Sequence, residues 1–184
     1  SELYDCPTVW WFIDSHTDFN RGLAIAHNFD YVFCAQLQGV EKLAENGILA
    51  EWLPCAADPV YHQSLHQKLS DRPFDVGFSG SVSDCGGWNP ERPSYLTEIS
   101  DRFPNSIITE TTKGGNSLVC SSSKVIFNQC VNNDINMRFF EAISSGCIVV
   151  TKRIKENGID RIALSDSVLF YDTKEEAIDQ IKYA

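Results

Sequence analysis

Two side chains that could bind a nucleotide stand three positions apart in residues 134–150, DINMRFFEAISSGCIVV. On a helix with 3.6 residues per turn, Arg138 and Glu141 share one face and lie about one turn apart. A guanidinium pairs well with a phosphate, and the two oxygens of a carboxylate can accept hydrogen bonds from both hydroxyls of a ribose. A local ion pair on a solvent-exposed face explains the same two residues equally well. The residue types alone leave both interpretations open.

The helix that positions these charges is predicted over residues 135–145. Apolar side chains recur on one side of it and predict a buried stripe: Ile135, Met137, Phe139 or Phe140, and Ile143. The sequence Ser144-Ser145-Gly146 then predicts a glycine C-cap, which allows close packing before the strand 147–151. The charged pair is therefore expected on the exposed side of a helix whose other side is fixed in a core.

A glycine-rich loop after a predicted strand is a second candidate for phosphate binding. In residues 74–87, FDVGFSGSVSDCGG, the strand ends at Ser79-Gly80-Ser81, and Arg92 lies in the first turn of the next helix. Ligands of α/β sheets bind at the carboxyl ends of strands, where a glycine lets a phosphate approach the backbone. The pattern is neither GxGxxG nor a P-loop, so this segment alone favours an ordinary strand-to-helix loop.

A carboxylate and an imidazole two positions apart form the candidate catalytic pair. Asp14 and His16 follow the apolar run of residues 9–13, in the sequence FIDSH. Side chains two residues apart on an extended chain point the same way, so the pair could provide a general base for an acceptor hydroxyl. Capping of the loop by Asp14 is the simpler alternative. His62 and His66 have i, i+4 spacing but no evident third ligand, so no metal is expected.

The composition excludes several classes of protein. The chain of 184 residues has a formal net charge of −10 and no basic cluster, which argues against nucleic acid as a partner. No apolar run approaches the roughly 20 residues of a membrane-spanning helix, so no transmembrane segment is expected. The abrupt start, SELYDCPTVWW, shows no signal peptide and indicates a missing N-terminal part. Seven cysteines without a CxxC pair indicate reduced thiols and a cytoplasmic protein.

Short apolar runs alternate with helical periodicity along nearly the whole chain. Strands are predicted at residues 9–13, 31–35, 50–54, 74–80, 106–110, 124–128, 147–151 and 167–171. Helices are predicted near residues 37–46, 91–102, 117–123, 135–145, 155–163 and 174–183. Continuous apolar strands that alternate with helices predict an α/β fold with a Rossmann-like parallel sheet. We expect residues 1–55 to end one α/β lobe, the polar segment 56–73 to be a linker, and residues 74–184 to form most of a second lobe.

The order of these segments resembles the donor-binding half of GT-B glycosyltransferases (glycosyl transferases group 1), and most closely the CgeB-like, spore-maturation-protein-like group. The resemblance rests on these stretches: WWFIDSH (10–16), FDYVFCAQ (29–36), WLPCAADP (52–59), DVGFSGS (75–81), Glu91-Arg92, SSSKVIFN (121–128) and NMRFFEAISSGCIVVT (136–151). It implies a GT-B type C-terminal lobe that binds a nucleotide-sugar donor over 74–184, and the tail of an N-terminal, acceptor-side lobe over 1–55.

The resemblance also assigns roles to individual residues. It implies that Glu141 holds the ribose of the donor and that Gly80 and Ser81 lie near the donor phosphates. Three basic residues are candidates to neutralise the diphosphate leaving group: Arg92, Lys124 and Arg138. A solvated lysine before a strand is an equally good explanation of Lys124. Because the chain has no Asp-x-Asp motif, we expect an enzyme that works without a metal ion. The resemblance implies a hexosyltransferase-type, GT-B enzyme. Its donor would be a nucleotide-diphosphate sugar, with no further cofactor, and its acceptor a glycan, a protein or a small molecule.

One position departs from the family pattern. Many retaining members carry a further glutamate eight positions before the ribose-binding one, where this chain has Asn133, followed by Asp134. An amide cannot act as a base, so this residue does not support a retaining mechanism. Asp134 either replaces the glutamate or, as the preferred interpretation, caps the helix. Two alternatives to the enzyme stay open: a non-catalytic nucleotide-sugar-binding fragment and, last, a Rossmann-type oxidoreductase, whose GxGxxG is absent.

Overall fold

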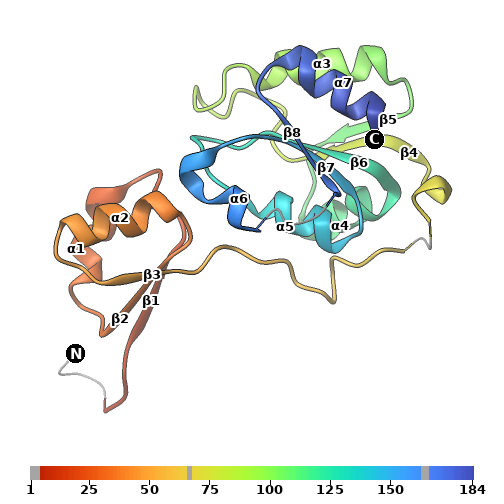
Figure 1. Cartoon of the computed structure of the whole chain (residues 1–184). Helices are drawn as coiled ribbons and strands as arrows, with labels where there is room; N and C mark the ends of the chain where they lie inside the picture. The colour runs from red at the N-terminus through yellow and green to blue at the C-terminus, as the bar shows by residue number, and fades with distance from the viewer. Residues whose placement is uncertain (1–4, 66–67, 163–165) are drawn as a thin grey trace. The chain divides into compact units, whose positions relative to one another are not determined.

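The protein forms two compact units (Figure 1). The structure is a computed structural model that describes residues 5–65, 68–162 and 166–184. The first unit comprises Ser1–Cys55, Asn132–Ile135 and Ile154–Ile162, and the second comprises Ala56–Val131, Asn136–Arg153 and Ala163–Ala184. The chain thus passes from the first unit to the second at Cys55, and the segment predicted as a linker packs with the second unit.

The first unit is built on a three-stranded parallel sheet. Its strands, in spatial order, are β1 (Val9–Phe12), β2 (Tyr31–Cys34) and β3 (Ala50–Trp52). Its helical elements are α1 (Phe19–Ala26), α2 (Leu37–Glu45), η2 (Lys155–Asn157) and α6 (Ile159–Ile162). The core between the sheet, α1 and α2 consists of Phe12, Ala26, Val32, Cys34 and Leu43.

Helix α1 is absent from the sequence-based prediction because Gly22 interrupts its short apolar pattern. The structure explains the glycine: a Cβ at this position would lie 2.0 Å from Cζ of the Phe12 ring. Asp18 starts the helix, since its carboxylate accepts a hydrogen bond from the backbone N–H of Arg21 at 3.2 Å. The missing side chain therefore allows α1 to pack closely against β1.

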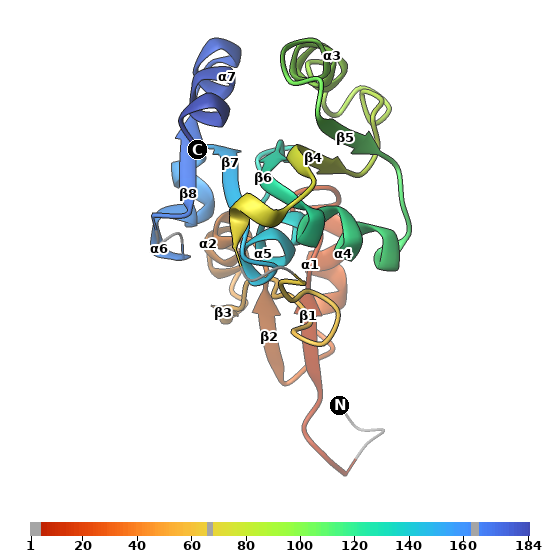
Figure 2. The same ribbon diagram turned by 90° about the vertical axis from the view of Figure 1, so that its right-hand side faces the viewer.

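The second unit is built on a five-stranded parallel sheet with the spatial order β5-β4-β6-β7-β8. The strands are β4 (Phe74–Ser79), β5 (Ser106–Thr109), β6 (Ser123–Asn128), β7 (Ile148–Lys152) and β8 (Val168–Tyr171). The helical elements are η1 (Leu69–Asp71), α3 (Arg92–Arg102), α4 (Lys113–Ser122), α5 (Met137–Ser144) and α7 (Lys174–Tyr183). Helices α3 and α7 cover one face of the sheet, and α4 and α5 cover the other (Figure 2). Both sheets are entirely parallel, which confirms the predicted α/β fold class.

The strand order defines where a ligand would bind in the second unit. Strand β4 pairs with β5 on one side and with β6 on the other, so the chain proceeds in opposite directions from β4. The carboxyl ends of β4 and β6 therefore flank a topological switch point, which is where open α/β sheets bind their ligands. Gly80 and Ser81 follow β4 at this edge, and Gln129 follows β6.

Helix α5 differs from its prediction in two respects. Phe139 and Ala142 are its fully buried residues, whereas Met137 is 45% exposed and therefore does not belong to a buried stripe. The helix cap is Asn136, whose side-chain oxygen accepts a hydrogen bond from the backbone N–H of Phe139 at 3.3 Å. The preferred interpretation of Asp134 as the cap is wrong, because the helix starts two positions later.

Two other helices have different bounds from those predicted. Helix α4 begins at Lys113 and not near residue 117, because the flexible pair Gly114-Gly115 lies inside its first turn. The helix predicted over 155–163 consists of the separate turns η2 and α6 within the described part of this range. Gly158 lies between them with a φ of +83°, a backbone conformation that breaks the helix.

Candidate functional site

Two arginine side chains converge at the carboxyl ends of β4 and β6. The guanidinium of Arg138 donates hydrogen bonds to the carbonyl oxygen of Ser79, at 2.6 Å, and to the side-chain oxygen of Asn128, at 3.2 Å. Arg92 donates to the carbonyl oxygen of Gln129 at 2.8 Å and to that of Ser81 at 3.2 Å. Helices α5 and α3 thus each contribute one cation to the switch point of the sheet.

Both cations stack on one aromatic ring. The guanidinium carbon of Arg138 lies 4.3 Å from the centroid of the Phe78 ring, and that of Arg92 lies 5.8 Å from it. The negative face of the ring offsets part of the positive charge, but such a contact contributes only about 0.5–2 kcal/mol. Phe78 is fully buried, and its ring gives buried Arg92 and half-buried Arg138 a fixed surface on which to pack.

Neither cation has a carboxylate partner among the hydrogen bonds and ion pairs of the described residues. Their acceptors are backbone carbonyls, the amide oxygen of Asn128 and the Cys85 thiol, which lies 2.6 Å from Nη1 of Arg92. Arg92 is only 3% exposed, and its buried Nε has no hydrogen-bond partner. Burial and the nearby charge of Arg92 lower the pKa of Arg138 to about 10. Guanidinium groups whose hydrogen bonds all end on neutral acceptors indicate a site that an anion completes.

Gly80 contributes space and not a hydrogen-bond donor. Its backbone N–H already donates to the carbonyl of Thr109 at 3.0 Å, so this group is not free for a phosphate. Its φ is +145°, and a Cβ at this position would lie 2.2 Å from Nη2 of Arg138. The Ser81 hydroxyl hydrogen-bonds to the Ser83 hydroxyl at 2.8 Å. In the segment predicted to bind phosphate, the missing side chain of Gly80 therefore leaves room for the guanidinium group of Arg138.

Glu141 lies one helical turn after Arg138 and faces three polar groups. One carboxylate oxygen accepts a hydrogen bond from the side-chain amide of Asn116 on α4. The other lies 3.5 Å from Nε2 of His62, which is buried and makes no hydrogen bond through either ring nitrogen. The carboxylate is also close enough to Arg138 to favour the charged guanidinium. A local ion pair, the alternative open at the sequence level, is not among the contacts of Arg138 in the described residues.

A cavity of about 360 Å³ opens beside Glu141. Its walls are side chains and backbone of the segment after Cys55, of α4 and of α5: Asp58, Tyr61, His62, Gly114, Met137 and Glu141. The hydroxyl of Ser117 and that of Ser144 donate to the carbonyls of Tyr61 and His62, so the two helices hold this segment in place. The exposed side chains of Tyr61 and Met137 give the cavity apolar walls around a polar base.

Lys124 lies at the opposite end of the sheet from the two arginines. It is the second residue of β6, and its Nζ pairs with the carboxylate of Asp75, the second residue of β4, at 2.6 Å. Because both strands run in the same direction, this ion pair marks their amino ends. The structure does not bring Lys124 together with Arg92, Arg138 or Glu141, and we leave it out of the candidate site.

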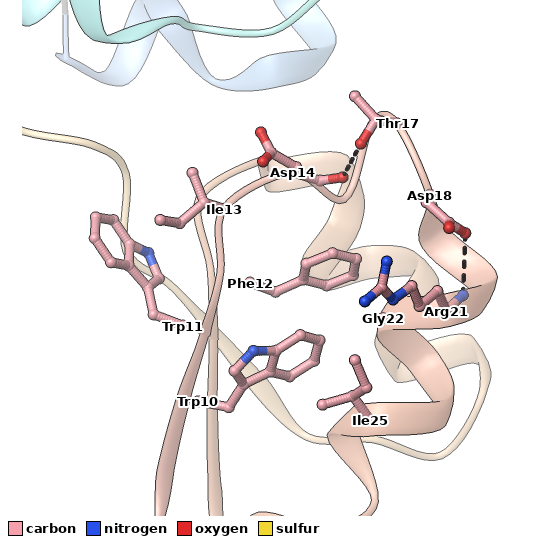
Figure 3. A pocket seen from close by; sticks show the side chains of 10 residues that line it. All are labelled: Trp10, Trp11, Phe12, Ile13, Asp14, Thr17, Asp18, Arg21, Gly22 and Ile25. Atoms are coloured by element: carbon pink, nitrogen blue, oxygen red, sulfur yellow. Dashed lines mark hydrogen bonds between the residues drawn. The ribbon is translucent and has the colours of Figure 1, made fainter.

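Asp14 and His16 do not share a cavity in the first unit. Asp14 lines a hollow of about 390 Å³ between β1 and α1, together with Trp10, Trp11 and Arg21 (Figure 3). Its backbone carbonyl accepts a hydrogen bond from the Thr17 hydroxyl at 2.9 Å, while its carboxylate points away from the aromatic rings (Figure 3). His16 lines a different, much smaller cavity. The geometry offers no contact that would make Asp14 the partner of His16.

Asn133 and Asp134 lie in a loop that the first unit holds tightly. Asn132 and Asn133 have φ angles of +48° and +60°, in the left-handed region that asparagine adopts more readily than most residues with a side chain. The carboxylate of Asp134 accepts a hydrogen bond from Nε2 of Gln36 at 3.0 Å. Burial raises the pKa of Asp134, and hydrogen bonds from Gln36 and from the backbone, together with the charge of His16, oppose this only in part.

Replacing Asp134 by asparagine is expected to stabilise the protein at neutral pH. The pKa of Asp134 is higher in the folded protein than in the unfolded chain. The carboxyl group therefore favours folding fully only below its unfolded-state pKa, and this contribution is lost as the pH rises through the folded-state pKa. Asparagine keeps an oxygen that can accept from Gln36. Thermal unfolding should show a higher midpoint for Asp134→Asn at pH 7.5, with a gain that shrinks toward pH 4. The exposed Asp101→Asn is the matched control, and a lower midpoint for Asp134→Asn at pH 7.5 would contradict the expectation.

The sequence analysis missed three polar residues of the site. Asn116, Asn128 and His62 contact Glu141 or Arg138 from positions between 10 and 79 residues away, as the residue numbers show. No local pattern marks such partners, because the fold alone brings them together. His66, which was considered as a metal ligand with His62, lies outside the described residues. The described residues contain no cluster of three His, Cys, Asp or Glu side chains that could hold a metal ion.

The fold and the site define an α/β protein with a buried cationic site at the switch point of a parallel sheet and a carboxylate one helical turn away. The sequence of residues 62–184 matches the family described as Glycosyl transferase-like. The chain therefore belongs to the glycosyltransferase-like family. The narrower CgeB-like assignment stays a prediction. No curated protein matches the sequence.

Two solved structures show the same fold at low sequence identity. Sucrose-phosphate synthase (tll1590) from Thermosynechococcus elongatus aligns with 99% of this chain at 12% identity and a TM-score of 0.56. Anabaena Alr3699/HepE, in complex with UDP and glucose, aligns with 96% at 12% identity and a TM-score of 0.58. The alignments cover 60% and 61% of those two chains, so this chain spans less than two thirds of their length. Within the described residues, no helix is both long and apolar enough to cross a membrane.

Proposed function

We propose that this chain binds a nucleotide-diphosphate sugar through its second unit and takes part in transfer of the sugar to an acceptor, without a metal ion. The observation that carries the proposal is the pair of guanidinium groups at the switch point, those of buried Arg92 and half-buried Arg138, whose hydrogen-bond partners in the described residues are all neutral. A diphosphate supplies the missing negative charge. Membership of the glycosyltransferase-like family supports this assignment of the anion.

Each group of the site then has a defined task. Arg138 and Arg92 bind the diphosphate and stabilise the charge that develops on it as the bond to the sugar breaks. Glu141 accepts hydrogen bonds from the ribose hydroxyls, and Asn116 holds its carboxylate in position. The cavity beside Glu141 has apolar walls suited to the nucleoside. Fixed donors in a water-poor site need no reorganisation during the reaction, which makes preorganised cations effective without a metal.

A glycan, a protein or a small molecule with a hydroxyl group all fit the proposed transfer, and the location in the cytoplasm stays a prediction. A non-catalytic nucleotide-sugar-binding chain is the second candidate function. The two candidates share the donor site and differ only in turnover.

Thermal unfolding in the presence of nucleotides tests the donor site. UDP, GDP, ADP and TDP are added in turn, with NAD as a non-sugar-donor nucleotide. A diphosphate at about 100 times its dissociation constant adds roughly 2.7 kcal/mol of stability, which raises the midpoint by about 5–10 °C for a chain of this size. We expect this gain with at least one diphosphate and its loss in Glu141→Ala.

Lys124→Gln is the matched control, because Lys124 pairs with Asp75 at the amino end of the sheet. It should keep the full gain. A gain with NAD alone, no gain with any diphosphate, or equal gains in the wild type and Glu141→Ala would each refute the proposal.

A further inference from the structure

His62 is a buried histidine whose ring has no hydrogen-bond partner among the described residues. Its side chain is 7% exposed, and both Nδ1 and Nε2 are buried without a partner. A buried polar atom that gives up water without gaining a hydrogen bond destabilises the fold, so each such atom calls for a reason. The ring is part of the wall of the cavity beside Glu141, where a bound ligand would change its surroundings.

The backbone of His62 is held at two points within the second unit. Its N–H donates to the carbonyl of Asp58 at 2.8 Å, and its carbonyl accepts from the hydroxyl of Ser144 on α5 at 2.5 Å. Because α5 also carries Glu141, these contacts keep the imidazole beside the carboxylate. Nε2 lies 3.5 Å from Oε1 of Glu141, just beyond the length of a good hydrogen bond. A small shift of the carboxylate therefore completes an N–H···O bond between them.

Asn116 holds the second oxygen of the same carboxylate. Its side-chain N–H₂ donates to Oε2 of Glu141. Its side-chain oxygen accepts from the thiol of Cys120 at 3.8 Å, and this contact supports the orientation of the amide. Burial raises the pKa of the Cys120 thiol, so this group stays protonated and can donate. The protein thus places one donor beside each oxygen of Glu141.

The carboxylate of Glu141 keeps two acceptor positions for a ligand. An ionised carboxylate offers about four lone-pair positions, two on each oxygen. Asn116 takes one position on Oε2, and one on Oε1 faces Nε2 of His62. Among the contacts of the described residues, one position then stays open on each oxygen of a side chain that is 13% exposed and lines the cavity. Two neighbouring hydroxyl groups match this pattern, whereas a single hydroxyl leaves one oxygen unpaired.

We propose that His62 is a positioning residue for Glu141 and that, with Asn116, it makes the site specific for a ribonucleoside diphosphate over its 2′-deoxy counterpart. The inference deepens the proposed function and rests on it. In the complex, Nε2–H of His62 donates to Oε1, and each carboxylate oxygen accepts from one hydroxyl of the ribose. A 2′-deoxyribose supplies only the 3′ hydroxyl, so one oxygen of a mostly buried carboxylate loses its partner.

Isothermal titration calorimetry with matched pairs of nucleotides tests the specificity. The nucleoside diphosphate that stabilises the chain is compared with its 2′-deoxy form, for example UDP with 2′-deoxy-UDP, so that base and diphosphate stay the same. The wild type should bind the ribose form about 10- to 150-fold more tightly, which is the effect of one hydrogen bond to a charged group. Equal affinities for the two forms would overturn the inference. So would stabilisation of the chain by TDP alone, because the sugar of TDP is 2′-deoxyribose.

Variants of His62 separate positioning from a purely structural role. His62→Phe keeps a ring but loses the donor, so the preference for the ribose form should fall by at least about threefold. His62→Gln places an amide N–H near the position of Nε2 and should keep the preference. His62→Asn, whose shorter amide does not reach Glu141, should lose it and provides the same test if His62→Phe does not fold.

The matched control is His27→Phe, at the exposed end of α1, which should keep the wild-type preference. A purely structural effect of His62 would weaken binding of both nucleotide forms equally. An unchanged preference in His62→Phe and His62→Asn would therefore overturn the positioning role.

The outcomes also separate this inference from the proposed function. If no nucleoside diphosphate binds the wild type, the proposed function fails and the ribose specificity fails with it. If a diphosphate binds and its binding depends on Glu141, but both sugar forms bind equally, the proposed donor site stands and only the ribose specificity is wrong.

Discussion

Replacing Arg72 by methionine is expected to lower the free energy of unfolding by about 3–5 kcal/mol. Arg72 is 4% exposed and comes from the segment before β4. Its guanidinium donates to five acceptors around the ends of α4 and α5: the carbonyls of Cys120, Ser123 and Ser145, the hydroxyl of Ser64 and the thiol of Cys147. The carbonyls of Ser123 and Ser145 accept at 2.7 Å and would lose this partner inside the protein. Methionine fills the space but donates nothing.

Thermal unfolding checks this prediction, and a loss of this size lowers the midpoint by about 6–20 °C for a chain of this length. Arg102→Met is the matched control with the same change of side chain and charge. Arg102 is exposed and, among the described residues, forms an ion pair with Glu98 of its own helix alone, so its removal should hardly move the midpoint. Equal midpoints for the two variants would show that the Arg72 network does not stabilise the fold.

Replacing Gly80 by alanine is expected to weaken binding of the stabilising nucleoside diphosphate by about 10- to 150-fold. The new Cβ would stand 2.2 Å from Nη2 of Arg138, so the guanidinium has to leave its contacts with Ser79 and Asn128. A hydrogen bond between charged groups contributes about 1.5–3 kcal/mol, and this range sets the expected factor. Isothermal titration calorimetry measures the dissociation constant directly.

Gly87→Ala separates this steric effect from backbone strain. Gly87 lies in the same loop with a φ of +88°, and a Cβ there meets no atom within 4 Å. Both variants carry the strain of a side chain at positive φ, which costs about 1–3 kcal/mol of stability. Only Gly80→Ala should also lose affinity. Comparable affinities of the two variants would mean that Arg138 does not bind the diphosphate.

The sequence predicts the parts of the fold that depend on local periodicity. The eight predicted strands correspond to β1–β8 within two residues at each end, because short runs of β-branched and aromatic residues mark strands. Arg138 and Glu141 were found for the same reason, since helical spacing alone places them on α5. Helix α1 and the start of α4 were missed because Gly22, Gly114 and Gly115 hide their helical character.

The rest of the site depends on contacts that no local pattern reports. Asn116 and His62 contact Glu141 from other segments, and Gln36 reaches Asp134 across 98 positions of the sequence. Lys124 shows the opposite error: its type and its place before a strand fit a phosphate site, but parallel strand order puts it at the amino end of the sheet. The order and direction of the strands decide which charged side chains lie close together. The local sequence pattern does not report this strand order.

The path of the chain has a consequence for how this protein can be divided. The backbone changes unit after residues 55, 131, 135, 153 and 162, so neither unit is a continuous stretch of polypeptide. A protein shortened to begin at Ala56 would still contain Asn132–Ile135 and Ile154–Ile162, but without the sheet and helices on which these segments pack. Loss of the first unit would therefore leave residues 132–135, before α5, and residues 154–162, after β7, without the elements on which they pack. The two units are inseparable at the level of the covalent chain, and they should be expressed and studied as one piece.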